Sequence, residues 1–445
     1  MPTSQSQQEN STRRQFLQST SVVMATGALA GGIARSAHAA GDETIRVALI
    51  GCGGRGTGAA MQALSTSGPV KLVAMADAFP DRLQSSLKNI SAQHAKRVDV
   101  PEERQFVGFD AYQQAIAADV DLVILATPPG FRPLHFAAAI EAGKHVFMEK
   151  PVAVDAPGVR AVLKAAEVAK QKSLCVGVGL QRHHQPIYLE TIKRLQDGAI
   201  GDIHMTRVYW NMGLLWVKER AVLEKQAERK LSELEYQMRN WYYFNWLCGD
   251  HITEQHIHNL DVSNWLKGSY PVKAHGMGGR QLRTGPNSGQ IFDHHAVEFT
   301  YEDGTVMVSQ CRHMADCWNS VSEHALGTHG NANIGKGRIV GEETWRYRGT
   351  NDISPYQIEH DDLFAAIRSG SSYNEAENGA KSTMTSILGR MATYSGKVIK
   401  WKDAIASEIS LVDTSSLHGF EDTAPVTPDA EGRYPVAIPG VTKVV

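Results

Sequence analysis

The chain of 445 residues contains 45 lysines and arginines against 47 aspartates and glutamates, carries a formal net charge of −2, and is 42% hydrophobic. This length suffices for two or three domains with cores of their own, and the balanced charge removes the electrostatic reason to expect a nucleic acid or an anionic membrane as partner. The five cysteines have no Cys-x-x-Cys spacing, which excludes a disulfide scaffold and a cysteine-rich zinc site and leaves at most a Cys311–Cys317 bridge to be tested.

The first 39 residues have the features of an export signal. Arg13 and Arg14 form a pair, a weakly apolar stretch runs from Val22 to Ile33, and Ala37-His38-Ala39 is typical of a cleavage site. The apolar stretch is far shorter than the roughly 20 residues that span a membrane. We therefore expect residues 1–39 to be a twin-arginine signal peptide. The twin-arginine export machinery would then deliver the protein to the periplasm, and cleavage would leave no membrane span; a disordered basic tail is the alternative.

The segment that follows has the pattern of a dinucleotide-binding β-α-β unit. A β-branched, apolar run at 44–50 leads into Gly51-Cys52-Gly53-Gly54-Arg55-Gly56, and a helix is expected to follow. In such a motif the glycines allow a tight turn, a close approach of backbone N–H groups to a pyrophosphate, and close packing of helix on strand. The helix N-terminus then receives the phosphate charge.

An acidic residue follows this motif at the spacing of a ribose ligand. A second predicted strand, at 70–76, ends at Asp77, about 20 residues beyond the last glycine. Because a 2′-phosphate would meet a like charge there, Asp77 favours NAD over NADP. An aspartate that simply ends the strand is the alternative.

Two further strands are expected to end at the same edge of a parallel sheet. The strand at 120–126 runs into Thr127-Pro128-Pro129, a helix at 135–142 ends before Gly143, and the strand at 144–148 runs into Glu149-Lys150-Pro151. Ligands of open parallel sheets bind outside the carboxyl ends of the strands. These residues therefore belong beside the nucleotide.

The segments described so far resemble the Gfo/Idh/MocA oxidoreductases, the family of glucose-fructose oxidoreductase and inositol dehydrogenase. Glu149-Lys150-Pro151 is the most specific part, and the likeness continues through 179–182, 198–201, 251–261 and 389–392. The resemblance implies an α/β fold, in which a doubly wound parallel Rossmann sheet at 43–173 precedes an α/β domain at 174–402. The second domain should hold an open, mixed, mostly antiparallel sheet that often mediates assembly, so a homo-oligomer is expected.

The resemblance also implies the roles of individual residues. Lys150 matches the lysine beside the nicotinamide, and Glu254 and His258 match the catalytic pair of an Asp-x-Gly-x-His-x-x-Asp pattern. Here Glu254 replaces the shorter Asp and His256 replaces Gly, so the substrate pocket should differ from that of a simple inositol dehydrogenase. The expected cofactor-binding residues are Gly51, Gly53, Gly54, Arg55, Gly56, Asp77, Thr127, Pro128, His135, Glu149, Lys150, Gln181 and Arg182. The expected substrate-binding residues are Lys150, Arg182, Trp241, Tyr242, Glu254, His256 and His258.

Oxidation of an alcohol requires these residue types. A histidine suits the general base because its ordinary pKa lies near neutral pH, and the i, i+4 spacing would put Glu254 and His258 on one helix face, where the carboxylate could orient the imidazole. Lys150 could donate a hydrogen bond to the reacting oxygen. The alternatives are that Lys150 forms a structural ion pair and that His258 is a helix residue whose hydrogen bonds are made within the fold.

Other segments carry weaker predictions. Residues 219–239 have the apolar spacing of one amphipathic helix, the aromatic run 241–246 could form a sugar-binding wall or core, and 297–301 with 306–310 form a hairpin pattern. The spacing His-x-x-Glu-x-His at 251–256 is not that of a zinc protease, so no metal ligand is expected. We expect His294, His295 and His313 to be surface or substrate-lining residues. The tail 403–445 should be an arm over a neighbouring subunit or disordered.

Three functions remain open at this point. The first is an exported oxidoreductase that holds NAD tightly and acts on a sugar or polyol, and it is the one we favour. The second is a glycoside hydrolase that works by transient oxidation and elimination, as the resemblance to NAD-dependent N-acetylgalactosaminidases implies. The third is a binding or sensing protein, against which the combination of Lys150, Glu254 and His258 argues.

Overall fold

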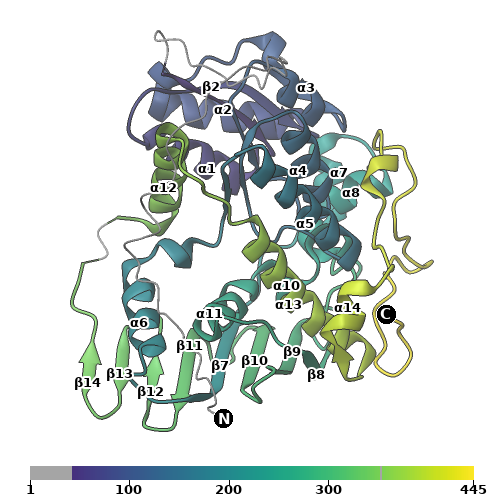
Figure 1. Ribbon diagram of the computed structural model, residues 1–445. Helices are drawn as coiled ribbons and strands as arrows, with labels where there is room; N and C mark the ends of the chain where they lie inside the picture. Colours follow the sequence, from purple (N-terminus) through teal and green to yellow (C-terminus); the bar gives the residue numbers. More distant parts are fainter. Residues whose placement is uncertain (1–42, 351–352) are drawn as a thin grey trace, which may run out of the picture. The chain divides into compact units, whose positions relative to one another are not determined.

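A parallel sheet of six strands forms the first part of the computed structural model, which describes residues 43–350 and 353–445 (Figure 1). The predicted signal peptide at 1–39 lies outside the described residues. The strand order is β3-β2-β1-β4-β5-β6, and every neighbouring pair is parallel, which confirms the predicted doubly wound sheet. The strands are β1 Ile45–Ile50, β2 Val70–Asp77, β3 Gln105–Val107, β4 Leu122–Leu125, β5 His145–Met148 and β6 Val176–Val178.

Helices cover both faces of this sheet because its strands are apolar on both sides. Along β1, Ala48 and Ile50 point into one buried cluster, and Val47 and Leu49 point into another. The helices are α1 Gly54–Ser65, α2 Pro80–His94, α3 Ala111–Ala117, α4 Arg132–Glu141 and α5 Ala156–Gln171, with short 3-10 turns η1 Ala95–Arg97 and η2 Glu102–Arg104.

The second sheet has nine strands in the order β14-β13-β12-β11-β7-β10-β9-β8-β15. Strands β7 and β10 are parallel and the other neighbours are antiparallel, which confirms the predicted mixed, mostly antiparallel sheet. The predicted hairpin is present as β9 and β10. The strands are β7 Ile203–Met212, β8 Lys273–Gly279, β9 His294–Thr300, β10 Val306–His313, β11 Ser320–Gly327, β12 Gly330–Asn333, β13 Arg338–Val340, β14 Thr344–Arg346 and β15 Ile399–Lys400.

One long helix joins the two sheets. Helix α13 (Ala376–Ser395) packs against α5 beside the first sheet and against β8 and β9 of the second (Figure 1). Residues of both sheets accordingly share one buried cluster that includes Val146, Val297 and Met384. The remaining helices are η3 Gln181–His184, α6 Pro186–Gln196, α7 Arg220–Ala227, α8 Glu233–Arg239, η4 Trp241–Tyr243, α9 Asn245–Cys248, α10 His251–Glu254, α11 Ile257–Lys267, α12 Pro355–Ser369, α14 Trp401–Ala406 and η5 Thr414–Ser416.

The prediction of one amphipathic helix over 219–239 is wrong, because the segment forms two helices, α7 and α8. The chain leaves α7 at Glu228, whose φ of 54° is left-handed. Ser232 then starts α8, and its hydroxyl accepts a hydrogen bond from the Glu235 N–H at 3.2 Å. The apolar spacing continued across this break, so periodicity alone did not reveal it.

The tail beyond α14 packs on its own chain, so the prediction of a disordered segment is wrong, and an arm over a neighbouring subunit stays a prediction. Leu417, Ala424 and Tyr434 are buried in one cluster with residues of α8 and η4. The ring of Phe420 stacks on Phe79 with the ring centres 4.9 Å apart, and it meets the edge of Phe109. The bridge between Cys311 and Cys317 does not form, since the first is buried and the second is exposed with a free thiol.

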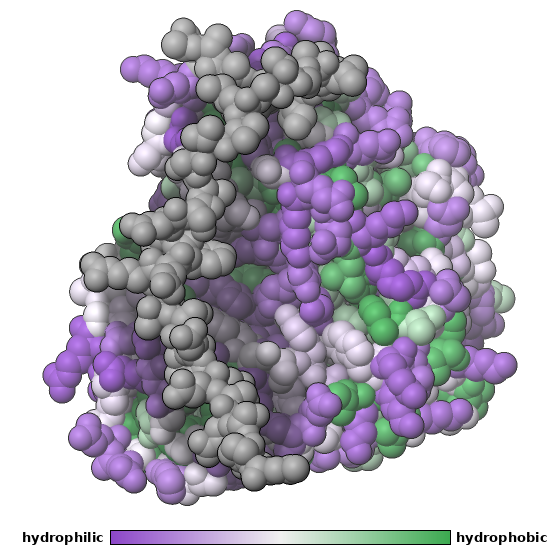
Figure 2. Space-filling view, in the orientation of Figure 1, coloured by the Kyte–Doolittle hydropathy of each residue, from purple (hydrophilic) through white to green (hydrophobic). Residues whose placement is uncertain are grey.

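Hydrophilic side chains dominate the face seen in Figure 2, and the hydrophobic residues there occur in small separate groups. Within residues 43–350 and 353–445, no helix has the length and apolar character needed to cross a membrane.

Helix α12 returns to the first sheet and brings a buried histidine with it. His360 is fully buried, its ring lies 4.1 Å from that of Phe147, and neither ring nitrogen has a hydrogen-bond partner among the described residues. Burial lowers its pKa to about 3. Because the unfolded chain binds this proton at about pH 6.5, His360 should destabilise the fold progressively as the pH falls below 6.5, by about 2 kcal/mol at pH 5.

We expect His360→Met to remove this loss, because methionine fills a similar volume without a polar atom. The free energy of unfolding, measured with urea at pH 5 and pH 7.5, should fall less with acid in this variant than in the wild type. His204→Met, at an exposed histidine, is the control and should follow the wild type. Equal acid sensitivity of the His360→Met variant and the wild type would show that His360 is not the residue responsible.

Candidate active site

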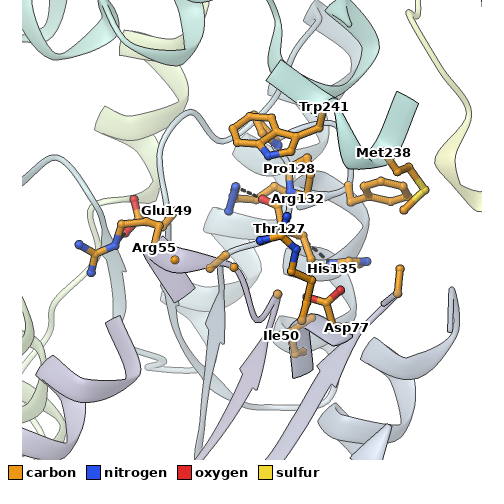
Figure 3. Close-up of a pocket in the computed structure, with 18 of the residues that line it drawn as sticks. Ile50, Arg55, Asp77, Thr127, Pro128, Arg132, His135, Glu149, Met238 and Trp241 are labelled. Atoms are coloured by element: carbon orange, nitrogen blue, oxygen red, sulfur yellow. Dashed lines mark hydrogen bonds and ion pairs between the residues drawn. The ribbon is translucent and has the colours of Figure 1, made fainter. Parts of the chain in front are cut away.

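A cavity of about 650 Å³ opens at the carboxyl ends of the strands of the first sheet. Its lining includes both halves of the predicted site, the nucleotide-binding residues and the catalytic ones. The predicted residues that line it are Gly51, Gly53, Gly54, Arg55, Asp77, Thr127, Pro128, His135, Glu149, Lys150, Trp241, Glu254 and His258. Figure 3 shows Ile50 and Asp77 at the strand ends, with Trp241 and Met238 across the cavity from them.

The glycine loop has the shape that a pyrophosphate needs. Gly51 has φ +98°, and a Cβ there would lie 2.5 Å from the Thr127 nitrogen. A Cβ on Gly56 would lie 1.9 Å from the Gly51 oxygen, so only glycine lets α1 pack this close to the turn. Gly53 and Gly54 face open space, and no side chain caps the start of α1. Free N–H groups at a helix N-terminus attract phosphate, so the loop fits a dinucleotide.

Asp77 is held at the end of β2 by two backbone groups. The Cys52 N–H donates to one carboxylate oxygen at 2.6 Å and the Phe79 N–H to the other at 2.9 Å. Each oxygen keeps a second lone pair, with which it can accept a ribose hydroxyl. Burial raises the pKa of this carboxyl, while the two backbone hydrogen bonds and Arg82 act in the opposite direction. Arg82 lines the same end of the cavity.

Two more predicted residues form an ion pair beside the loop. The Arg55 Nε lies 2.8 Å from the Glu149 Oε1, and Figure 3 shows the pair at the side of the cavity opposite Met238. The Arg55 guanidinium also lies over the ring of Tyr356, 4.9 Å from its centre. Tyr356 comes from α12, so a residue far along the chain orients the arginine of the glycine loop.

Lys150 and Glu254 form the polar centre of the other end. The Lys150 Nζ donates to the backbone oxygen of Glu254 and lies 3.3 Å from its Oε1. The prediction that Glu254 and His258 share a helix face is wrong, because Glu254 ends α10 and His258 lies in the first turn of α11. Among the described residues Glu254 therefore pairs with Lys150, and makes no hydrogen bond to the imidazole.

His258 is buried at the edge of the cavity. Its ring lies nearly parallel to that of Trp210, with the ring centres 5.9 Å apart, and its Nδ1 has no hydrogen-bond partner among the described residues. Burial, followed by the positive charges of Lys150 and Arg182, holds the pKa of His258 well below its usual range. The imidazole is therefore neutral near pH 7, and it is a weaker base than an exposed histidine.

Other predicted residues lie outside the lining of this cavity. Arg182 pairs with the buried Glu323, and Gln181 donates to the Tyr356 hydroxyl at 3.3 Å. His256 is fully buried and its Nε2 lies 2.8 Å from the Ser309 hydroxyl, while Tyr242 is buried among aromatic side chains. Gly56 packs behind the loop. The geometry thus offers Arg182, His256 and Tyr242 no direct contact with a ligand in the cavity.

Several lining residues were not predicted, because long-range packing alone brings them there. Arg132 is buried and donates to the backbone oxygens of Leu125, Thr127 and Pro151, so it fixes the ends of two strands. Arg132 lies ahead of the helix predicted at 135–142, so no local pattern marked it. The other unpredicted polar or aromatic lining residues are Phe79, Arg82, Phe109, Tyr112, Phe131, Trp210, Trp216, Lys218, Arg239, Gln255 and Tyr356.

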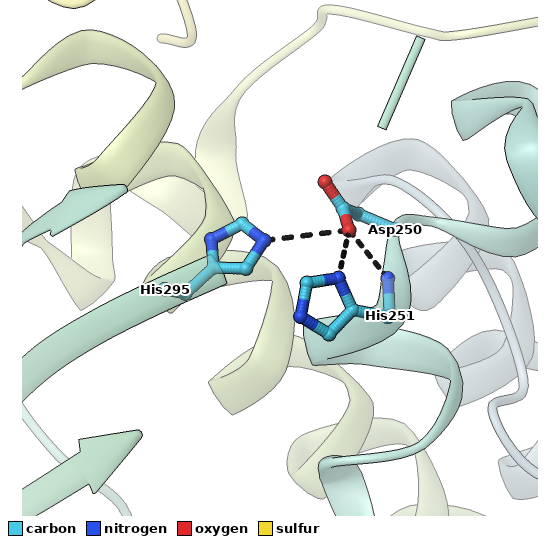
Figure 4. A group of neighbouring side chains, drawn as sticks. All are labelled: Asp250, His251 and His295. Carbon is cyan, nitrogen blue, oxygen red and sulfur yellow. Dashed lines mark hydrogen bonds and ion pairs between the residues drawn. The ribbon is translucent and has the colours of Figure 1, made fainter. Parts of the chain in front are cut away.

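Two buried histidines lie close to the carboxylate of Asp250. The Asp250 Oδ1 receives the His251 backbone N–H and Nδ1 and faces the His295 Nε2 at 3.3 Å (Figure 4). The Asp250 Oδ2 receives the Phe292 N–H and the Tyr394 hydroxyl. These three side chains have the spacing of a metal site, but the carboxylate already accepts four hydrogen bonds.

The expectation of surface or substrate-lining positions for His295 and His313 is wrong, since both are buried and neither lines the cavity. His294 is half-buried on the same strand. Both errors have one cause, because the face of β9 and β10 that carries His295 and His313 packs against buried segments of the chain.

Comparison with known proteins finds similarity in the first part of the chain. Residues 45–180 match the family described as "Oxidoreductase family, NAD-binding Rossmann fold" (GFO_IDH_MocA). An inositol 2-dehydrogenase of Rhizobium meliloti (strain 1021) is 27% identical over 229 residues, which make up 52% of this chain and 57% of that protein. The chain spans about half the length of the curated relatives it matches.

Solved structures share the fold over most of the chain. An aldose-aldose oxidoreductase from Caulobacter crescentus, solved with glycerol, has a TM-score of 0.62 at 19% identity, covering 80% of this chain and 99% of that one. A scyllo-inositol dehydrogenase from Lactobacillus casei, with NAD(H) and scyllo-inositol, has a TM-score of 0.59 at 21% identity, covering 81% and 100%. These likenesses confirm the predicted α/β fold class.

Proposed function

We propose that the protein is an exported, NAD-dependent oxidoreductase that transfers hydride between a sugar or polyol CH–OH group and a tightly bound nicotinamide cofactor. The proposal rests on one observation, the presence in one cavity of the glycine loop with Asp77 and of Lys150 with Glu254 and His258. The comparisons support it, because the similar proteins are named as dehydrogenases or oxidoreductases of inositols and aldoses.

Each residue has a defined task in this proposal. When bound, the oxidised nicotinamide supplies the carbon that accepts hydride from the substrate. His258, neutral because it is buried, accepts the proton of the substrate hydroxyl. Lys150 donates a hydrogen bond to the oxygen on which negative charge develops, and Glu254 holds the Lys150 ammonium in place.

The same proposal includes NAD as the cofactor and the periplasm as the location. Asp77 favours a ribose 2′-hydroxyl over a 2′-phosphate, since the phosphate would stand beside a carboxylate. Export through the twin-arginine route suits a protein that must fold around its cofactor before it leaves the cytoplasm. Because no NAD pool is expected outside the cytoplasmic membrane, the cofactor must stay bound and be regenerated in the same site. A homo-oligomer built through the second sheet is the expected assembly.

The test is made on the exported protein without added NAD. Sugars, polyols and glycosides are added one at a time, while the absorbance of the bound nicotinamide and the products are followed. A lasting NADH signal that a second carbonyl compound clears is the expected result. Continuous glycoside cleavage without net NADH would instead support the NAD-dependent glycoside hydrolase, and protein without nucleotide would contradict both. Recovery of a chain starting after Ala39 or Ala40 from the periplasmic fraction tests the export.

A further inference from the structure

A buried arginine fixes the tautomer of a histidine behind the cavity. Arg283 is 3% exposed, and the two terminal nitrogens of its guanidinium contact the Phe292 backbone oxygen at 3.0 Å and the His313 Nδ1 at 2.7 Å. A guanidinium has donors only. The His313 Nδ1 must therefore accept this hydrogen bond with its lone pair, and it cannot carry a proton.

The His313 imidazole in turn donates one hydrogen bond on the side of the cavity. The ring is fully buried at the end of β10, and burial, together with the charges of His251 and Arg283, holds the pKa of His313 well below its usual range. A neutral imidazole has one N–H, so the proton is on Nε2. This Nε2 lies 2.8 Å from the Gln255 Oε1, and it donates to that oxygen.

Gln255 follows Arg283 and His313 as the third residue of this hydrogen-bond chain, and it lines the cavity. It links α10 to α11 between Glu254 and His258 and lines the cavity with both of them. Since its Oε1 receives the His313 N–H, the side-chain NH₂ group is the end left for the cavity. No residue within 43–350 or 353–445 accepts a hydrogen bond from the Gln255 Nε2.

We infer that Gln255 determines substrate specificity by presenting a fixed N–H donor to an oxygen of the bound sugar or polyol. Arg283 is the positioning residue: acting through His313, it prevents the Gln255 amide from rotating by 180° and exchanging its oxygen and nitrogen. The inference rests on the proposed function. A fixed N–H donor can bind a hydroxyl, ether or carbonyl oxygen. It cannot form a hydrogen bond with an ammonium group, which also has only donors. The site should therefore exclude substrates with an amino group at the contacted position.

Gln255→Glu is the main test, because it keeps the size of the side chain and replaces the donor by an acceptor. The His313 N–H still binds one carboxylate oxygen, and the other oxygen faces the cavity. The probes are D-glucose, myo-inositol and the mono-aminodeoxy analogues of D-glucose, whose affinities are measured on the full exported protein with its cofactor. In the wild type at least one amino analogue should bind about tenfold more weakly than glucose, and in the variant that preference should be reversed.

Two further variants separate the specificity role from a structural one. Gln310→Glu makes the same change at an exposed position on β10, three residues from His313, and should leave the affinities unchanged. Arg283→Met removes the donor that fixes the tautomer, so glucose and the amino analogue should bind more nearly alike. A rise in KM with little change in kcat is expected for Gln255→Glu with the unsubstituted sugar, since the contact binds substrate and transition state alike.

The tautomer of His313 has a readout that needs no substrate. In protein labelled with ¹⁵N-histidine, the resonances that vanish in His313→Gln should show a protonated Nε2 and an unprotonated Nδ1. A proton on Nδ1, or amino analogues that bind as tightly as glucose to both wild type and Gln255→Glu, would overturn the inference while leaving the oxidoreductase intact. Failure of the wild type to bind any of the probes would overturn the proposed function and the sugar contact together.

Discussion

Replacement of Lys150 by methionine is expected to lower kcat for oxidation of the sugar substrate by about 10² to 10³-fold, while the nucleotide stays bound. The ammonium lies near enough to His258 to lower the pKa of its imidazole, and Glu254 holds it through both the backbone oxygen and the carboxylate. Methionine keeps the length of the side chain and removes the donor, so the developing negative charge on the reacting oxygen loses its partner. The measurement is the single-turnover rate of nicotinamide reduction, with the bound nucleotide counted separately.

An exposed lysine provides the matched control for this prediction. Lys170→Met removes the same group from α5, where the lysine pairs with Glu167 and Glu377 on the surface, and should leave the rate unchanged. A Lys150→Met enzyme with wild-type turnover and a full complement of nucleotide would mean that the Lys150–Glu254 pair is structural. Loss of nucleotide with loss of rate would instead move Lys150 into the group of cofactor-binding residues.

The second large effect is expected at Gly56, where alanine should abolish nucleotide binding. The added Cβ would lie 1.9 Å from the Gly51 oxygen and 3.1 Å from the Ala126 Cβ, so the turn and the start of α1 have to move apart. Overpacking of this kind costs about 1–3 kcal/mol, and here the displaced backbone is also the one that meets the pyrophosphate. We expect a lower melting temperature and protein purified without its cofactor.

Gly58→Ala is the control within the same helix. A Cβ there would meet only the end of the Arg55 side chain at ordinary contact distance, and alanine in a helix interior is favoured over glycine by about 0.5–1 kcal/mol. This variant should therefore be as stable as the wild type or more so and should keep its nucleotide. If both variants bound nucleotide equally well, the close packing of α1 on the turn would not be needed for the site.

Local sequence patterns predicted the glycine turn and the strand ends that lie beside it in the cavity. The strand, glycine turn and helix at 45–65 and the acidic residue at 77 lie near one another in the chain, so their spacing reflects their geometry directly. The strand ends at Thr127 and Glu149 could be placed as well, because parallel strands deliver their carboxyl ends to one edge.

The substrate half was predictable only where the resemblance named the residues. Lys150, Glu254 and His258 do meet in the cavity, but the helix assumed to carry the last two is interrupted at Gln255 and His256. Residues such as Lys218 and Tyr356 reach the cavity through the packing of distant segments, for which single-chain spacing contains no information. The burial of His295 and His313 could not be predicted either, because the sequence does not show which face of the second sheet other segments cover.

The stacking of Phe420 on Phe79 also affects when the nucleotide site can form. Phe79 and Phe109 line the cavity beside Asp77, and the side chain that backs them, Phe420, comes from a segment that the ribosome makes long after the first sheet. A nascent chain folds from its N-terminus as it emerges, so the first sheet can assemble long before this segment exists. The wall at that end of the cavity is thus completed only after Phe420 has been made. A polypeptide released before that point would have the glycine loop but an unfinished binding site, and capture of the dinucleotide would distinguish chains that contain this segment from chains that lack it.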